Sequence, residues 1–120
     1  MREIKFKAKS VCGGAWVYGN FIHSKRFEGC PNEYRIHNQD TGIESDVWPE
    51  TVCEFTGMVD RKGIEIYEHD IVEYCNADGV PRVGIIRYHK DGFEIFKNGI
   101  FDRSLRGLCK IEVIGNVHDK

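Results

Sequence analysis

Hydrophobic and polar residues alternate over residues 2–9, at the start of the chain. Apolar side chains occupy every second position, and the positions between them include Lys5, Lys7 and Lys9. Alternation of this kind is typical of a strand with one buried face. We therefore expect a strand here, with its three lysines facing solvent.

The rest of the N-terminal half continues this pattern of strand and turn. Residues 12–14 suit a turn, and the apolar stretch at residues 16–22 completes a hairpin with the first strand. Alternation returns at residues 33–37, and polar turn residues follow at 38–42. A proline at the start of residues 49–54 favours a single helical turn, because proline fits the first position of a helix.

The second half of the chain consists of short apolar stretches separated by turn sequences. The dipeptides Asp-Gly and Asn-Gly that divide them are strong short-range signals of hairpins. A looser segment lies at residues 105–108. Short strands with tight turns over about 50 residues favour a small closed barrel, because closure removes exposed edges. The expected strands cover residues 71–75, 82–89, 93–97 and 110–114.

These patterns predict an all-β protein in two parts. Residues 1–48 are expected to form an N-terminal β subdomain, and residues 49–120 the small barrel. The barrel part includes residues 54–75, which combine a tight turn, an acidic stretch and a strand. We expect the joint between the two parts within residues 43–57.

The composition is that of a globular protein, with 41% hydrophobic and 30% charged residues. A net charge of −2 does not favour nucleic acid or a membrane surface as a partner. Residues 44–78 are nevertheless acidic, with ten acidic and two basic residues, whereas both ends of the chain are basic. No apolar run has transmembrane length and no signal-peptide pattern is present, so we expect a cytoplasmic protein.

The five cysteines and five histidines fall at scattered spacings. An odd number of cysteines without a secretory signal indicates free thiols. Structural zinc sites use short-spaced pairs of cysteines or histidines, and the sequence contains no such pair. We therefore expect no cofactor, and no metal or disulfide that supports the fold. A zinc site assembled from distant residues is an alternative, with the candidate ligands Cys12, His23, Cys30 and His37.

An acidic cluster made of Asp60, Glu65, Glu68 and Asp70 is one candidate for chemistry. Glu68 and Asp70 are two positions apart, so on an extended chain both project from one face. There they could share Mg²⁺ or act as the acid–base pair of a hydrolase. In the alternative that we favour, Asp60 shapes a turn and Asp70 hydrogen-bonds backbone where a strand begins.

Several spaced motifs run almost from one end of the chain to the other. They are Met1-Arg-Glu-Ile-Lys-Phe6, Trp16-Val-Tyr-Gly19, Pro49-Glu-Thr-Val52, Phe55-Thr-Gly57, Asp60-x-x-Gly63-x-x-Ile66-Tyr67-Glu68-x-Asp70-Ile71-Val72 and Val113-Ile114-Gly115-Asn116. Together these motifs resemble the YopX-like family of bacteriophage and prophage proteins. The block over residues 49–72 is the most specific part of the resemblance.

The resemblance implies an all-β protein with a self-associating N-terminal part and an SH3-like barrel in the C-terminal part. It brings no catalytic residues. One departure is His69, which stands where the family usually has glycine. This departure matters if the position requires a positive φ, which histidine tolerates better than β-branched residues do. The motif residues are interpreted as structural, and they are Asp60, Gly63, Ile66, Tyr67, Glu68, Asp70, Ile71 and Val72.

The aromatic residues of the N-terminal half favour self-association. They are too many for a small sheet to enclose, and aromatic residues are common anchors of interfaces. We therefore expect a non-enzymatic protein that forms at least a dimer and contacts a further, unidentified protein. The candidate interface residues are Phe6, Trp16, Tyr18, Phe21 and Tyr34.

Two alternatives remain open at this point. The barrel could bind nucleic acid, with Arg82 and Arg87 gripping phosphates beside aromatic side chains. Such binding should then use a contiguous basic face. A metal-dependent hydrolase would instead require Glu68 and Asp70 to converge with a third ligand in a pocket.

Overall fold

The computed structural model describes residues 5–24, 27–29, 33–75, 78–89, 92–105 and 110–119. Over these residues the protein is all-β, with two antiparallel sheets, one short 3₁₀ turn and no α-helix. The chain divides into two compact units, Met1–Phe55 (unit 1) and Thr56–Lys120 (unit 2). Within the described part of the chain, no helix is long and apolar enough to cross a membrane.

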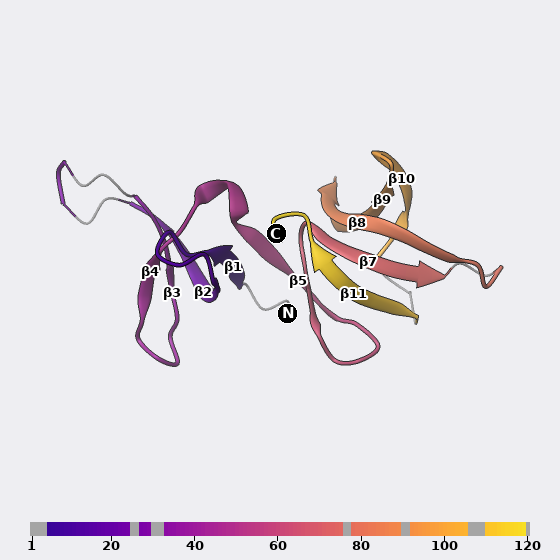
Figure 1. The fold of residues 1–120 in the computed structure, drawn as a ribbon, viewed down its shortest axis with the longest axis horizontal. Coiled ribbons are helices and arrows are strands. Elements are labelled where there is room, and N and C mark those ends of the chain that lie inside the picture. Colours follow the sequence, from indigo (N-terminus) through magenta and orange to yellow (C-terminus); the bar gives the residue numbers. More distant parts are fainter. Residues whose placement is uncertain are drawn as a thin grey trace. The chain divides into compact units, whose positions relative to one another are not determined.

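Unit 1 is a small antiparallel sheet (Figure 1). Its strands pair in the order β4-β3-β2-β1, and the start of β5 pairs with β1. The 3₁₀ turn η1 joins β4 to β5 and begins at a proline. The elements are β1 (Phe6–Lys9), β2 (Trp16–His23), β3 (Tyr34–His37), β4 (Glu44–Asp46), η1 (Pro49–Thr51) and β5 (Cys53–Val59).

The core of unit 1 lies on one face of this sheet. Ala8, Ile36 and Val47 are buried there, and partly buried side chains surround them. Gly19 lies where β2 leaves β1 to pair with β3. A Cβ atom at this position would be 2.1 Å from the backbone oxygen of His37, so only glycine allows the approach.

Unit 2 contains the end of β5 and a five-stranded sheet. The end of β5 continues into the short strand β6, which lies beside it. The strands of the five-stranded sheet follow the order β10-β9-β8-β7-β11. The elements are β6 (Glu65–Tyr67), β7 (Asp70–Cys75), β8 (Pro81–His89), β9 (Gly92–Lys97), β10 (Ile100–Ser104) and β11 (Ile111–Asn116).

The closed barrel expected from the sequence is not observed over the described residues. β11 pairs with β7, and β10 pairs with β9, so these two strands form the edges of an open sheet. The tight turns of the sequence specify which neighbours pair along the chain. They carry no information on whether the first and last strands meet, because that contact is long-range.

The core of unit 2 is larger than that of unit 1 and lies against one face of the five-stranded sheet. Gly84 makes room in it, because a Cβ atom there would lie 2.5 Å from Cγ2 of Ile95 and 3.3 Å from Cε1 of Tyr74. The hydroxyl of Tyr74 donates to Asp102, and burial together with this bond raises the pKa of Tyr74 to about 12. The core residues are Ile66, Val72, Tyr74, Ile86, Phe93, Ile95, Leu105 and Ile111.

The expected strands of the second half are confirmed as β7, β8, β9 and β11, within one or two residues at their ends. The first hairpin and the strand at 34–37 are also observed. Four strands were not expected from the pattern, namely β4, β5, β6 and β10. The helical turn is shorter than expected and covers only Pro49–Thr51. Parts of the expected segments lie outside the described residues, namely positions 2–4, 76–77, 90–91 and 106–108.

The expectation of a solvated lysine face on β1 is wrong for Lys7. This residue is only 8% exposed, and its Nζ lies 4.4 Å from the centre of the Trp16 ring. Lys9 approaches the same ring at 5.3 Å. In the β1–β2 hairpin Trp16 lies opposite Lys9, so its ring covers the lysine stems while its face attracts the ammonium groups.

Candidate functional site

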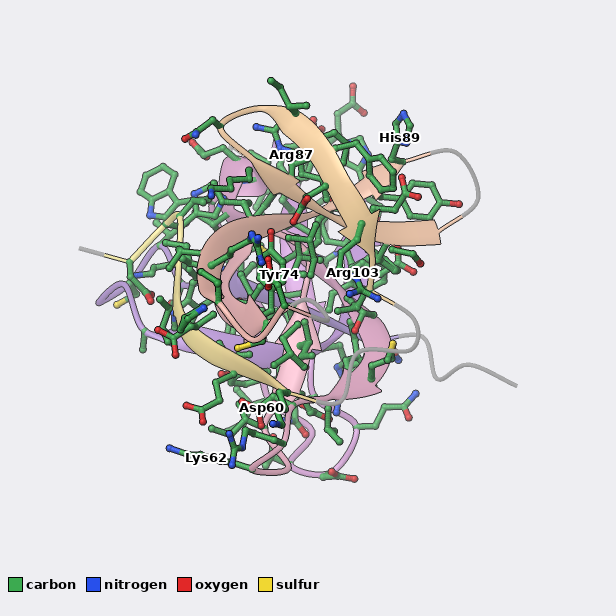
Figure 2. All side chains as sticks on the ribbon, turned by 90° about the vertical axis from the view of Figure 1, so that its right-hand side faces the viewer. Asp60, Lys62, Tyr74, Arg87, His89 and Arg103 are labelled. Carbon is green, nitrogen blue, oxygen red and sulfur yellow. The ribbon has the colours of Figure 1, made fainter. Side chains whose placement is uncertain are left out.

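Asp60 organises the turn between β5 and β6. Its Oδ1 accepts hydrogen bonds from the backbone N–H groups of Lys62 (2.8 Å) and Ile64 (2.9 Å), and its Oδ2 accepts one from Val113 (3.0 Å) in β11. Burial raises the pKa of Asp60, but these three bonds and the charge of Lys62 outweigh burial, so the pKa lies below its ordinary value of 3.8. Figure 2 shows Asp60 and Lys62 together at one end of unit 2.

Asp70 is buried at the first position of β7, with no exposed surface. Its Oδ2 accepts a hydrogen bond from the backbone N–H of Tyr67 at 2.8 Å, which holds the turn between β6 and β7. Its Oδ1 accepts one from the side-chain amide of Asn116 in β11, also at 2.8 Å. Asn116 in turn accepts a hydrogen bond from the backbone N–H of His118 at 2.9 Å.

His69 lies between β6 and β7 with a φ of 71°, in the left-handed region. The backbone at position 69 therefore adopts the positive φ that glycine accommodates without strain, and histidine here departs from the family pattern at some cost. Its backbone N–H donates to the oxygen of Ile86 (2.7 Å), and its oxygen accepts from Val117 (3.0 Å). Its imidazole meets that of His118 edge to face, with ring centres 5.3 Å apart and planes at 79°.

A hollow of about 410 Å³ opens beside this pair of histidines. It combines two imidazoles, a carboxylate and a guanidinium with apolar side chains. The carboxylate Oε2 of Glu68 is 3.8 Å from Nε2 of His69. Arg87 lies at the end of unit 2 away from Asp60 (Figure 2). The lining residues are Glu68, His69, Ile85, Arg87, Tyr88, Val117 and His118.

The acidic cluster of the sequence does not come together around one ligand. Glu68 lines the hollow, whereas both oxygens of Asp70 are engaged in the interior. Glu65 accepts a hydrogen bond from the hydroxyl of Tyr67 at 3.0 Å. Over the described ranges, no group of three metal-ligating side chains includes Glu68 or Asp70.

The candidate interface residues of unit 1 divide between the two faces of its sheet. Phe6, Phe21 and Tyr34 pack against the core, with ring centres 5.8 Å apart for Phe6 and Phe21 and 6.2 Å apart for Phe21 and Tyr34. Trp16 and Tyr18 alternate with core-facing positions of β2 and lie on the opposite face. Tyr18 is 41% exposed.

A second hollow, of about 230 Å³, opens in unit 1 beside Trp16 and Tyr18. The loop that follows β3 forms its other side and presents Ile43, which is 62% exposed. Side-chain bonds fix this loop, because Oδ1 of Asn38 accepts from the backbone of Thr41 (3.1 Å), and Oγ1 of Thr41 accepts from that of Ile43 (3.2 Å). Ile43 therefore has a defined position although it is exposed.

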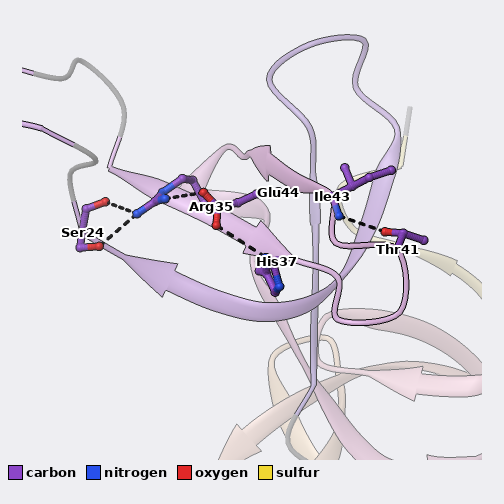
Figure 3. A network of polar contacts seen from close by, with 6 residues as sticks. All are labelled: Ser24, Arg35, His37, Thr41, Ile43 and Glu44. Carbon is purple, nitrogen blue, oxygen red and sulfur yellow. Dashed lines mark hydrogen bonds and ion pairs between the residues drawn. The ribbon is translucent and has the colours of Figure 1, made fainter.

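A polar network holds the strands on which this loop is mounted (Figure 3). Arg35 in β3 is buried and donates to Glu44 in β4 through Nη1. Its Nη2 donates to the backbone oxygen of Ser24 at 2.8 Å and to the Ser24 hydroxyl at 3.1 Å. Glu44 also lies 3.6 Å from Nδ1 of His37. The network joins β2, β3 and β4 across the edge of the sheet.

The comparisons with known proteins give one result. The family model described as "YopX protein" matches residues 3–120 of the chain. The chain belongs to the YopX family. Comparison with curated proteins and with solved structures found no significant match.

In this YopX family member the two arginines considered for nucleic acid lie on opposite faces of β8. Arg82 is paired across strands with Tyr74 on the core side, whereas Arg87 is paired with Glu94 on the outer side. Arg82 donates to both carboxylate oxygens of Asp78, at 3.0 and 2.6 Å, which lowers the pKa of Asp78 and raises that of Arg82. The two arginines therefore do not form one contiguous basic face.

The described candidate zinc ligands of the N-terminal half, Cys12, His23 and His37, do not form a group of metal-ligating side chains. His23 lies 3.4 Å from a carboxylate oxygen of Glu33, and His37 lies beside Glu44. Cys12 is an exposed free thiol. Cys30 lies outside the described residues, as does Cys109. The other described cysteines, Cys53 and Cys75, are also free thiols.

Sequence reasoning missed His118 entirely and assigned no role to Asn116 of the YopX closing motif. His69 and His118 are far apart in sequence, so a search for short-spaced ligand pairs cannot find them. The only local signal was a histidine at a position that requires positive φ. Asn116 could have been predicted as the partner of Asp70, the first residue of β7, only if the pairing of β11 with β7 were known.

Proposed function

We propose that this YopX family member is a non-enzymatic protein that acts through protein–protein contacts, with self-association as the first of them. The observation that carries this proposal is the exposed apolar surface of unit 1. Tyr18 and Ile43 are exposed by 41% and 62%, and together with Trp16 they line one hollow. Rigid aromatic side chains beside such a hollow are typical interface anchors, because they bury much area at little entropic cost.

The partner that fits this surface best is a second copy of the chain. The basic N-terminal segment and the acidic segment at 44–78 give each copy complementary charges. A two-fold arrangement would let each copy present the same surface to the other. We therefore propose a homo-oligomer, most simply a dimer.

We further propose that the protein works in the cytoplasm of a bacterial cell that carries a phage or prophage. Its resemblance to phage and prophage proteins supports this origin. In that setting a second, unidentified protein of the phage or the host is the natural further partner. Unit 2 would then serve as the scaffold for this second contact.

We assign unit 2 to the SH3-like class of small β domains. The support is its strand order, in which four consecutive strands pair as neighbours and the last strand returns to the first. The hairpin of β5 and β6 precedes this sheet. Since the described sheet is open, the assignment rests on connectivity alone.

Two other functions have less support. A nucleic-acid-binding barrel would use Arg82 and Arg87 together, but the two lie on opposite faces and Arg82 is paired with Asp78. A hydrolase built on Glu68 and Asp70 would need both carboxylates at one ligand, but Asp70 is enclosed. Protein contact requires neither arrangement.

Analytical ultracentrifugation of surface variants tests the proposal. The double variant Tyr18→Ser/Ile43→Ser should sediment as a 13.8 kDa monomer, whereas the wild type should not. Val80 is a matched control, because it is 53% exposed but lies in unit 2. Val80→Ser should keep the mass of the wild type. If Val80→Ser lowered the mass as much as the double variant does, or if the double variant kept the mass of the wild type, the interface would not lie on unit 1.

A further inference from the structure

We propose that His69 and His118 form a binding site for a divalent transition-metal ion such as Zn²⁺, beside the hollow that Glu68 also lines. The site lies wholly within unit 2 and is independent of the proposed interface on unit 1. The ion would bind to the folded protein at the edge of the 410 Å³ hollow. It would not be required for folding, because the hydrophobic core of unit 2 lies elsewhere.

The first argument is the distance between the two imidazoles. A ring nitrogen of His69 lies within 4.8 Å of a ring nitrogen of His118. Tetrahedral zinc with Zn–N bonds of about 2.0–2.1 Å places two nitrogens roughly 3.3 Å apart. Small rotations of two side chains at the rim of a hollow can close this difference without moving the backbone. Neutral imidazole is also the side chain best suited to such ions.

The second argument is that the backbone of both histidines is fixed. The oxygen of His69 accepts a hydrogen bond from Val117, the residue before His118. The N–H of His118 donates to Asn116, whose amide is bonded to the buried Asp70. The backbone of His69 is therefore tied to the residue before His118, and the backbone of His118 is tied to the buried Asn116. A site built on such fixed elements needs little reorganisation to bind an ion.

The third argument is the backbone conformation of His69. A left-handed φ of 71° costs a residue with a side chain roughly 1 kcal/mol or more, and glycine avoids this cost. Strained residues of this kind cluster at ligand sites, where the side chain has a task. Here the side chain points to another histidine and lies 3.8 Å from a carboxylate oxygen of Glu68.

The other described histidines lack this arrangement. His23, His37 and His89 each lie beside one glutamate, at 3.4, 3.6 and 2.6 Å. His89 also lies in unit 2, so it provides a matched control. Its side chain is 43% exposed, and its Nδ1 lies beside a carboxylate oxygen of Glu94.

Calorimetric titration of the untagged, EDTA-treated full chain with Zn²⁺ tests the site. We expect one ion per chain, and at least about a tenfold loss of affinity in His118→Ala and in His69→Gly. Glycine at position 69 removes the imidazole but suits the left-handed backbone, so this variant should remain folded. His89→Ala should bind as the wild type does. In NMR spectra, Zn²⁺ should shift the imidazole signals of His69 and His118 first.

Three results would overturn the proposal. The first is no saturable binding up to about 1 mM Zn²⁺. The second is a loss of affinity in His89→Ala as large as in His118→Ala, which would indicate unspecific binding to surface histidines. The third is a response of the two imidazoles to inorganic phosphate but not to Zn²⁺, which would make the hollow an anion site.

Discussion

The side-chain amide of Asn116 donates a hydrogen bond of 2.8 Å to the buried carboxylate of Asp70, 46 positions earlier in the chain. This bond joins β11 to the entry of β7. The other oxygen of Asp70 holds the backbone of Tyr67, so one enclosed carboxylate fixes a turn and a strand pairing together. The acidic group that first suggested chemistry therefore has a structural role.

Removal of the Asn116 amide should destabilise the protein measurably. Asn116→Ala leaves Oδ1 of Asp70 without this donor in the interior, which should lower the free energy of unfolding by about 1–3 kcal/mol. Urea unfolding followed by circular dichroism measures the change. Asn20→Ala, at an exposed position of β2, should stay within about 0.5 kcal/mol of the wild type. A loss no greater than that of the control would contradict the structural role of the pair.

Two substitutions at His69 isolate the cost of its backbone conformation. Both His69→Gly and His69→Ala remove the imidazole and its contact with His118. Only glycine relieves the positive φ of 71°, so His69→Gly should be more stable than His69→Ala by about 1 kcal/mol. The melting temperatures of the two metal-free variants, compared side by side, give the answer. Equal melting temperatures would mean that the position does not require a left-handed backbone.

Gly84 should tolerate no side chain. A Cβ atom there would meet Cγ2 of Ile95 at 2.5 Å, so Gly84→Ala should reduce stability by about 1–3 kcal/mol through overpacking. Gly92 is the matched control, since it is also in unit 2 and a Cβ atom there would have nothing within 4 Å. Chemical denaturation of both variants should separate them clearly. Similar midpoints would argue against the packing of β8 on β9.

Asp60 should make stability fall in acid. Its pKa is lower in the folded protein than in the unfolded chain, so its contribution is present above the unfolded pKa, about 4, and is lost as pH falls through the folded value. The variant Asp60→Asn cannot lose a carboxylate charge at this position. Between about pH 6 and pH 2, the stability difference between wild type and variant should therefore shrink. A difference that is constant over this range would contradict the assignment.

The sequence predicted those parts of the fold that depend on local chemistry. The apolar stretches around Val72 and Ile86 predicted strands β7 and β8. The Asn98-Gly99 dipeptide predicted the hairpin turn between β9 and β10. Asp70 also lies three positions from the backbone that it binds, so spacing alone favoured its structural role. Strand β10 was missed because its sequence, residues 100–104, has two apolar residues followed by three polar ones and so does not alternate.

The candidate site depends on contacts that no local pattern encodes. Lys7 was expected to face solvent, but its position under Trp16 follows from the register of β1 and β2. In the same way, His118 meets His69 only because β11 returns to β7. These contacts depend on which strands pair over long distances in the sequence. That pairing depends on the closure of long loops, which local sequence propensity does not encode.

The mass of the full-length protein in solution tests the proposed function most directly. Light scattering on the untagged chain at tens of micromolar should give at least twice the 13.8 kDa of one copy, because the surface around Tyr18 and Ile43 would be covered by a second copy. Dilution should shift the mass toward one copy. A mass of 13.8 kDa over the whole concentration range would contradict self-association.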